Sequence, residues 1–262
     1  MRYISTIPTL VLAALAVACS NDPSAPAGQI EYGSPVSVGN GQARSYIVTA
    51  DGKPTEVGIA LSETALDGLP PGQSEMDSKS YLLPLPADNS TGYQVVELDW
   101  NPAGHPPPQV YTVPHFDFHF YTASLDLRNS IVPTDPDFVA KADSNPPAKY
   151  RPDGYISPLV NGHAQAVPMM GVHWLNMAAP EFNGSPFTAT FIYGAWDGHF
   201  TFVEPMVSLA YLQTHPDTEP AVVMPSAFET DGYRPQAYRV KYDADAKEFR
   251  VGITQLKFIK GS

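Results

Sequence analysis

The chain has 262 residues, and its 27 acidic against 15 basic side chains give a net charge of −12 at pH 7. This excess of negative charge excludes a typical nucleic-acid-binding protein, because such a surface needs clustered lysine and arginine. The single cysteine, Cys19, excludes intrachain disulfides and cysteine-rich zinc sites.

The amino terminus has the pattern of an export signal. Arg2 precedes an apolar stretch at 7–18, which is too short to span a bilayer but suits the core of a signal peptide. The small residues before Cys19 resemble a bacterial lipoprotein signal, in which the cysteine is acylated and becomes the first residue. We therefore expect a signal peptide at 1–18, lipidation of Cys19 and a flexible tether over 19–29. An ordinary secretory signal with an incidental cysteine is the alternative.

These features predict a protein held by a lipid anchor in the bacterial cell envelope, at the outer membrane and facing the periplasm or the surface. Residues 30–262 are long enough for one large β-rich domain, or for two β subdomains with a boundary near 101–110.

The composition of the chain favours strands over helices. Its 28 prolines and 19 glycines interrupt the sequence at short intervals, whereas aromatic and β-branched residues supply strand formers. We predict a mainly β fold, a β-sandwich or barrel-like arrangement of antiparallel sheets with a few short helices. Strands are expected at 42–49, 57–61, 81–84, 93–100, 110–122, 171–175, 188–193, 199–204, 238–243 and 250–256, and helices at 62–69, 135–143 and 206–214.

The segment 114–121, PHFDFHFY, alternates strictly between aromatic and polar residues, which is typical of a strand with two unlike faces. His115, Asp117 and His119 share one face. At a rise of about 3.3 Å per residue, the two histidines lie about 13 Å apart along the strand. One metal ion can therefore bind Asp117 and one histidine, but it reaches both histidines only if the strand is bent or bulged.

Partners for this row are expected from other strands. His173 lies on the predicted strand at 171–175, where a lone histidine is either a core residue or a metal ligand. Two alternating runs around Asp197-Gly198 predict a β-hairpin. On its second strand, alternation places Phe200, Phe202 and Glu204 on one side. A buried Glu204 meets a cation or receives backbone hydrogen bonds.

Several of these strings together resemble a known family. They lie at 104–108 (GHPPP), 114–121, 170–174 (MGVHW), 193–198 and 204–206 (EPM). They are similar to a family of exported bacterial proteins with a domain of unknown function, which includes a Thermus protein controlled by an extracytoplasmic-stress sigma factor. The resemblance extends from about residue 30 onward and implies a β-rich exported domain, a histidine-rich centre and homo-oligomeric assembly. It also adds His105 as a site residue, and it implies no reaction or small-molecule ligand.

Our leading hypothesis is a divalent-metal site at the centre of the barrel or sandwich. Imidazole and carboxylate ligands without thiolate suit zinc or another first-row metal. If the site is catalytic, an unligated Glu204 or Asp117 would act as general base in a reaction that the sequence does not define. The candidate ligands are His105, His115, Asp117, His119, His173 and Glu204.

Two other hypotheses remain open from the sequence. In the first, the protein is a binding lipoprotein without catalysis, which sequesters a metal or a small ligand or acts in envelope stress. In the second, the polar row is a hydrogen-bond network that fixes strand register and assembly contacts.

Overall fold

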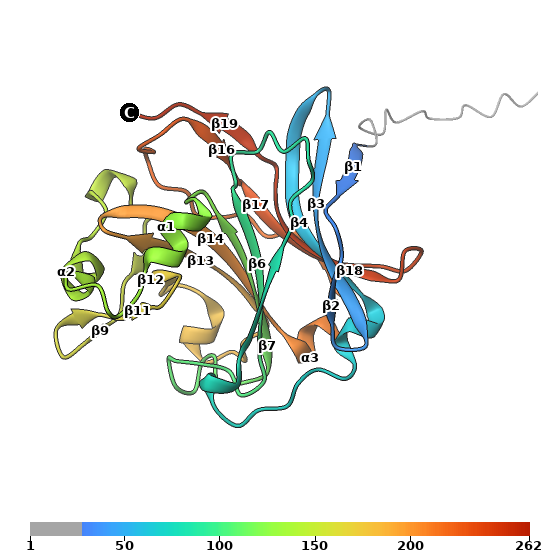
Figure 1. The fold of residues 1–262 in the computed structure, drawn as a ribbon, viewed down its shortest axis with the longest axis horizontal. Coiled ribbons are helices and arrows are strands. Elements are labelled where there is room, and N and C mark those ends of the chain that lie inside the picture. The colour runs from blue at the N-terminus through green and yellow to red at the C-terminus, as the bar shows by residue number, and fades with distance from the viewer. Residues whose placement is uncertain (1–27) are drawn as a thin grey trace, which may run out of the picture.

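The structure is a computed structural model, and it describes residues 28–262. The predicted signal peptide at 1–18, Cys19 and residues 20–27 of the tether lie outside the described residues. The described chain folds into two large antiparallel sheets, called sheet A and sheet B below, with smaller strand pairs and short helices around them (Figure 1). The prediction of a mainly β fold is confirmed.

Sheet A combines the two ends of the described chain, with its strands in the order β1-β3-β4-β18-β17-β15 and β2 paired to β3. The strands are β1 (Gln29–Tyr32), β2 (Val36–Val38), β3 (Gly41–Ala50), β4 (Lys53–Ser62), β15 (Asp217–Thr218), β17 (Ala237–Asp243) and β18 (Glu248–Thr254).

Sheet B is formed by the middle of the chain, in the order β11-β12-β13-β14-β7-β6-β5 with β8 paired to β12. The strands are β5 (Lys79–Leu83), β6 (Val95–Asn101), β7 (His115–Tyr121), β8 (Tyr155–Ile156), β11 (Ala166–Val167), β12 (Gly171–Asn176), β13 (Ala189–Trp196) and β14 (His199–Ser208). Two separate strand pairs are β9 (Leu159–Val160) with β10 (His163–Ala164), and β16 (Gly232–Arg234) with β19 (Lys257–Ile259).

The helices of the described residues are short, and none has the length and apolar composition needed to cross a bilayer. They are α1 (Leu125–Ser130), α2 (Phe138–Asp143), α3 (Leu209–Leu212) and the 3₁₀ turns η1 (Glu63–Leu66), η2 (Glu75–Asp77), η3 (Ala148–Tyr150) and η4 (Pro180–Asn183).

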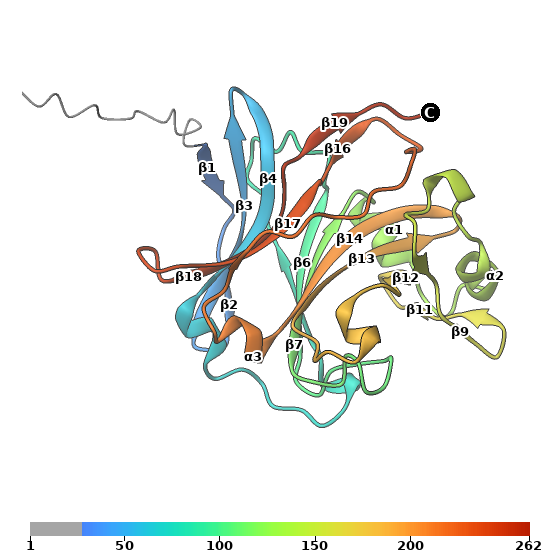
Figure 2. The same ribbon diagram turned by 180° about the vertical axis from the view of Figure 1, so that it is seen from behind.

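The main hydrophobic core joins the facing sides of the two sheets. Phe116, Phe118 and Phe120 on β7 belong to one buried cluster with Ile59 of β4 and Val251 of β18. The opposite face of sheet B, called its outer face below, is turned away from sheet A. In Figures 1 and 2, α2 and β9 lie beyond the hairpin end of β13 and β14, on the side of the molecule away from sheet A.

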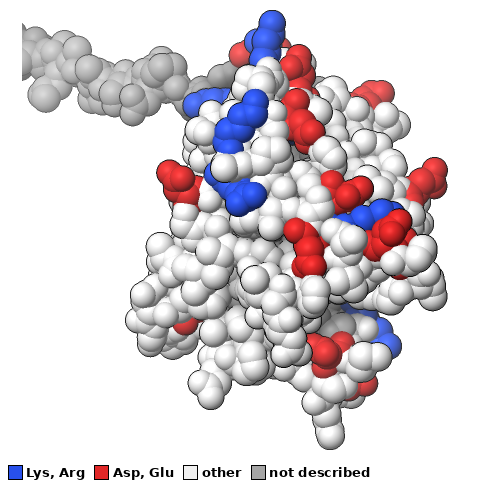
Figure 3. Space-filling view, turned by 90° about the vertical axis from the view of Figure 1, so that its left-hand side faces the viewer, with Lys and Arg blue, Asp and Glu red and all other residues white. Residues whose placement is uncertain are grey.

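The space-filling view from the side of α2 shows that charged side chains are scattered over this face (Figure 3). Much of its lower part carries neither Lys and Arg nor Asp and Glu, and no large basic patch is visible there. Exposed apolar residues in this part of the chain include Val139, Ile156, Leu159 and Val160.

Two boundary predictions were wrong. Residues 110–114 belong to the loop before β7, and β14 continues to Ser208 where a helix was expected from Met206. Proline favours a first helical turn, but Pro205 instead lies in the strand and pairs with Phe191 of β13. Pairing to β7 is interrupted at Glu204 and Pro205 and then resumes. The helix begins at Leu209, where the Ser208 side chain accepts a hydrogen bond from the Tyr211 N–H.

Candidate metal centre

The polar row of β7 lies on the outer face of sheet B, opposite the aromatic core. Strand pairing sets His115 beside Asn101 of β6, Asp117 beside Asp99 and His119 beside Glu97. All of these residues are at most 4% exposed. The sequence prediction placed the site at the centre of the sandwich or barrel. This was wrong, because period-two alternation gave that space to the phenylalanines of β7.

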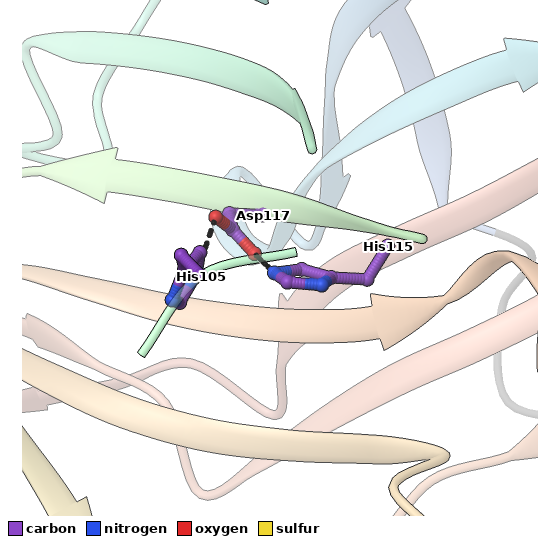
Figure 4. A group of neighbouring side chains, drawn as sticks. All are labelled: His105, His115 and Asp117. Atoms are coloured by element: carbon purple, nitrogen blue, oxygen red, sulfur yellow. Dashed lines mark hydrogen bonds and ion pairs between the residues drawn. The ribbon is translucent and has the colours of Figure 1, made fainter. Parts of the chain in front are cut away.

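Three of the predicted residues form a first triad, His105, His115 and Asp117 (Figure 4). One ligand atom from each lies within 4.8 Å of the others. His105 Nε2 is 3.3 Å from Asp117 Oδ2, and His115 Nε2 is 3.2 Å from Asp117 Oδ1. The Asn101 side-chain amide donates to Asp117 Oδ2 at 2.6 Å and so orients the carboxylate.

Backbone carbonyls define the protonation of both histidines in this triad. His105 Nδ1 lies 2.8 Å from the Pro106 carbonyl oxygen, and His115 Nδ1 lies 2.7 Å from that of Val113. Because a carbonyl only accepts, each Nδ1 must carry a proton and donate it. In a neutral imidazole, Nε2 then bears the lone pair, and both Nε2 atoms face Asp117. A histidine that donates Nδ1–H to a carbonyl and presents Nε2 is the usual arrangement of a metal ligand.

The other three predicted residues form a second triad, His119, His173 and Glu204. Glu204 Oε2 is 3.3 Å from His119 Nε2 and 3.4 Å from His173 Nε2. On its other side, His119 Nδ1 is 3.1 Å from Asp99 Oδ2. Asp99 therefore occupies the position of the carboxylate that orients a ligating histidine in carboxylate–histidine–metal arrangements.

The two triads contain an unusual concentration of unsatisfied polar atoms. Of the eight buried side-chain nitrogen and oxygen atoms without a hydrogen-bond partner in the described chain, seven belong to the triads or to Asp99. They are Asp99 Oδ1 and Oδ2, His115 Nε2, Asp117 Oδ1, His119 Nδ1 and Nε2, and Glu204 Oε2. Several lie close together without hydrogen-bond geometry. Since unpaired buried polar atoms are costly, a cation bound between them would fit this donor set.

Burial and neighbouring charge shift several pKa values in the triads. Burial opposes charge on Asp117, but His115 and His105 outweigh it and hold the pKa of the carboxyl well below its usual range. Burial likewise opposes charge on His105, yet the hydrogen bond and charge of Asp117 raise its pKa to about 9. Burial and the charge of His119 lower the pKa of His173 to about 3, which keeps it neutral. Burial raises the pKa of Glu204 to about 7, against the influence of His119.

The triads differ in their access to solvent. The His105 side chain is 27% exposed, and it lies on the loop between β6 and β7 rather than on a strand. Phe187 packs edge-on against His115, with 5.6 Å between ring centroids. In the second triad His119 is fully buried and the His173 side chain is 19% exposed, with the Phe202 ring against both. The first site is therefore the more open one.

The structure brings all six predicted ligands together, but in two sites rather than one. His115 and His119 belong to different triads, and the ladder between β7 and β6 is regular, so β7 has no bulge that brings them to one ion. The expected alignment of Phe200 with Glu204 was wrong. A register shift between Gly194 and Ala195 of β13 turns Phe200 to the inner face, where it packs on Trp174.

Sequence reasoning missed the polar row of β6, which includes Glu97, Asp99 and Asn101. The signal was present, since the three alternate with Val96, Leu98 and Trp100 in the same period-two pattern as β7. Glu97 forms an ion pair with Arg128 of α1, whose Nε donates to Glu97 Oε2 at 2.9 Å. Arg128 is remote in sequence, and no spacing indicates this pair.

Fold and site together define a two-sheet antiparallel β protein with two buried clusters, each made of two histidines and one carboxylate. Residues 49–100 match the family model TTHB210-like, described as "Hypothetical protein TTHB210". This range includes β4, β5, most of β6 and Asp99, but none of the six triad residues. No curated protein and no solved structure matches the chain. The broader resemblance at 104–206 stays a prediction.

Proposed function

We propose that the protein is an exported, lipid-anchored lipoprotein of the bacterial envelope that binds divalent metal ions at the two triads. The observation that carries the metal-binding proposal is the orientation of His105 and His115. Both Nδ1–H groups are used by backbone carbonyls, and both Nε2 atoms converge on Asp117. This arrangement needs a cation between the nitrogen atoms and the carboxylate. Without a metal ion, the raised pKa of His105 keeps a proton on its Nε2, and a divalent ion would replace that proton.

The donor set favours zinc or another first-row metal. Two imidazoles and one carboxylate are the protein ligands of some catalytic zinc sites and of non-haem iron sites, which leave coordination positions open. Neither triad contains a thiolate, and each has too few oxygen donors for calcium. Each triad thus offers three protein ligands to one metal ion, which leaves further coordination positions of the ion for water or substrate.

Metal-dependent catalysis is a second candidate function, and the exposure of His105 favours it at the first triad. A substrate must reach the ion, and His105 is the most solvent-exposed of the six ligands. An unligated Glu204 or Asp117 was expected as the general base of a catalytic site, and each of them lies beside two histidines in a triad. A base role would require one of them to leave the metal during the reaction.

The envelope location rests on the sequence alone. An apolar stretch at 7–18 followed by Cys19 supports export and acylation, and the short segment from Cys19 to Gln29 would keep the folded body near the membrane. Homo-oligomeric assembly is part of the same proposal and is supported by the family resemblance.

Metal content by plasma mass spectrometry tests the proposal. We expect the untagged protein to hold about two equivalents of metal, and His119→Ala and the nearly isosteric Glu204→Gln to hold about one, because each removes a ligand of the second triad. His163→Ala is the matched control, since His163 is exposed and pairs with Asp143 outside both triads. Metal absent from the wild-type protein even after incubation with zinc, manganese and ferrous iron would favour the structural network of charged histidines and carboxylates instead.

A further inference from the structure

A cavity unrelated to the triads lies beside the β13–β14 hairpin. With its opening it measures about 690 Å³, and it is enclosed by the hairpin, the segment 224–235 and Tyr93. Tyr193 of β13 and Phe200 of β14 line it from the inner face of sheet B. The metal triads lie on the outer face of the same sheet, and Phe202, which packs on His119 and His173, also lines the cavity.

Aromatic side chains form most of the cavity wall. Tyr193 and Phe200 meet edge-on, with 5.6 Å between their ring centroids. Tyr93, Tyr150 and Phe228 line the other sides. A pocket with aromatic walls and few polar groups is typical of small-molecule sites, and its ring faces suit a planar apolar group.

One cation, Arg234 of β16, enters this aromatic cavity. Its Nη2 donates to the Thr230 carbonyl oxygen at 2.9 Å and to Thr230 Oγ1 at 3.2 Å, and Nη1 makes a longer contact of 3.4 Å with the Tyr233 carbonyl oxygen. The guanidinium carbon lies 5.0 Å above the Phe228 ring. Among residues 28–262, no carboxylate lies within 4.0 Å of this guanidinium. The Nε–H group and one Nη1–H group therefore remain free to donate to a carboxylate ligand.

The remaining polar groups of the cavity are already engaged. Glu229 is the lining carboxylate, and its Oε2 lies 2.8 Å from His199 Nδ1. The Tyr193 hydroxyl donates to the Val223 carbonyl oxygen at 2.9 Å, so its oxygen can still accept. Arg234 is thus the one cation among the residues that line the cavity, and it has no carboxylate partner there.

We propose that this cavity binds a small aromatic carboxylate, with its ring between the aromatic walls and its carboxylate on Arg234. A charge-assisted hydrogen bond from a free N–H of Arg234 to the carboxylate supplies the orientation, and the tyrosine oxygens accept from a hydroxyl or amine on the ligand. This proposal does not rest on metal binding at the triads.

Calorimetric titration with phenylacetate and with its neutral analogue phenylacetamide tests the proposal on the purified protein. We expect phenylacetate to bind, phenylacetamide to bind at least tenfold more weakly, and Arg234→Gln to weaken phenylacetate binding at least tenfold. Lys53→Gln is the charge-matched control, since Lys53 begins β4 at the exposed turn after β3, and it should bind as the wild type does.

Three results would overturn the proposal. They are no binding of phenylacetate at millimolar concentration, equal affinity for the acid and the amide, and unchanged affinity in a folded Arg234→Gln. The last result would also be obtained if phenylacetate bound to a metal ion in a triad. If Arg234→Gln fails to fold, the comparison of acid with amide on the wild-type protein decides the question.

Discussion

The outer faces of sheets A and B both bury carboxylates, but they pair them with different side chains. On sheet A, Glu56 accepts from the Tyr46 hydroxyl at 2.5 Å and from Arg239 Nη1 at 2.6 Å. Glu248 likewise accepts from Arg250 Nε at 2.7 Å. On sheet B, Asp117 and Glu204 face imidazole nitrogens instead.

This difference separates a structural ion pair from a candidate ligand site. Arginine is always charged and only donates, so its pairs with Glu56 and Glu248 are complete without a further group. A neutral imidazole can present a lone pair. When that lone pair faces a carboxylate, a cation must lie between the two groups. Buried carboxylates alone therefore do not indicate a metal site, whereas their partners do.

Glu97 tests the comparison most severely, because it lies on the outer face of sheet B but pairs with arginine. Arg128→Met should leave Glu97 buried without its cation and lower the free energy of unfolding by about 3–5 kcal/mol. Urea denaturation measures this change. The double variant Glu97→Gln/Arg128→Met is the control and should regain much of the loss. A change below about 1 kcal/mol in Arg128→Met would contradict the assignment of a structural pair.

The second prediction contrasts one carboxylate from each sheet. Asp117→Asn should lower metal affinity at the first triad more than about 100-fold, since it removes a metal ligand rather than a residue that only orients a ligand. Glu56→Gln on sheet A should leave metal affinity unchanged. Competition titrations with a chromophoric chelator measure both. Equal effects of the two variants would remove the distinction between the faces.

The third prediction concerns Asp99, which contacts His119 but belongs to neither triad. Asp99→Asn should reduce metal affinity at the second triad by about 10–100-fold while the first triad is unaffected, because Asp99 orients His119. The exposed Asp88→Asn is the matched control. Should Asp99→Asn instead abolish binding at the second site, Asp99 itself would be a ligand.

The smallest expected effects come from one glycine in each sheet. A Cβ at Gly194 would meet the Phe202 ring, and one at Gly58 would meet the Tyr46 ring. Each alanine variant should lose about 1–3 kcal/mol of stability from overpacking. Only Gly194→Ala should also weaken metal binding, because Phe202 packs against His119 and His173. Thermal unfolding and the same competition titration separate the two effects.

Much of the fold was predictable because the strands are short, alternating and bounded by glycine and proline. The hairpin at Asp197-Gly198 and the two faces of β7 follow directly from local pattern. The strand containing Pro205 did not, because pairing with β13 at Pro205, and with β7 before and after it, overrides the preference of proline for a helix start.

The members of the site were predictable, but their grouping was not. Period two places Asp117 and His119 on one face, yet only strand order decides that Glu204 and His173 lie beside His119. That His105 instead joins His115 depends on how the loop before β7 folds back, which spacing does not reveal. The partner of Glu97 was out of reach for the same reason.

His105 is the one ligand of the six that a loop carries, whereas strands carry the other five. Loops open locally at far lower free energy than a paired sheet. An ion in the first triad could therefore exchange within the lifetime of the folded protein, each time the loop lifts away. An ion in the second triad would be released only when sheet B itself opens. The two sites would then differ chiefly in the residence time of the metal ion. The ion in the first triad would exchange with solution, whereas the ion in the second triad would stay bound as long as the protein is folded.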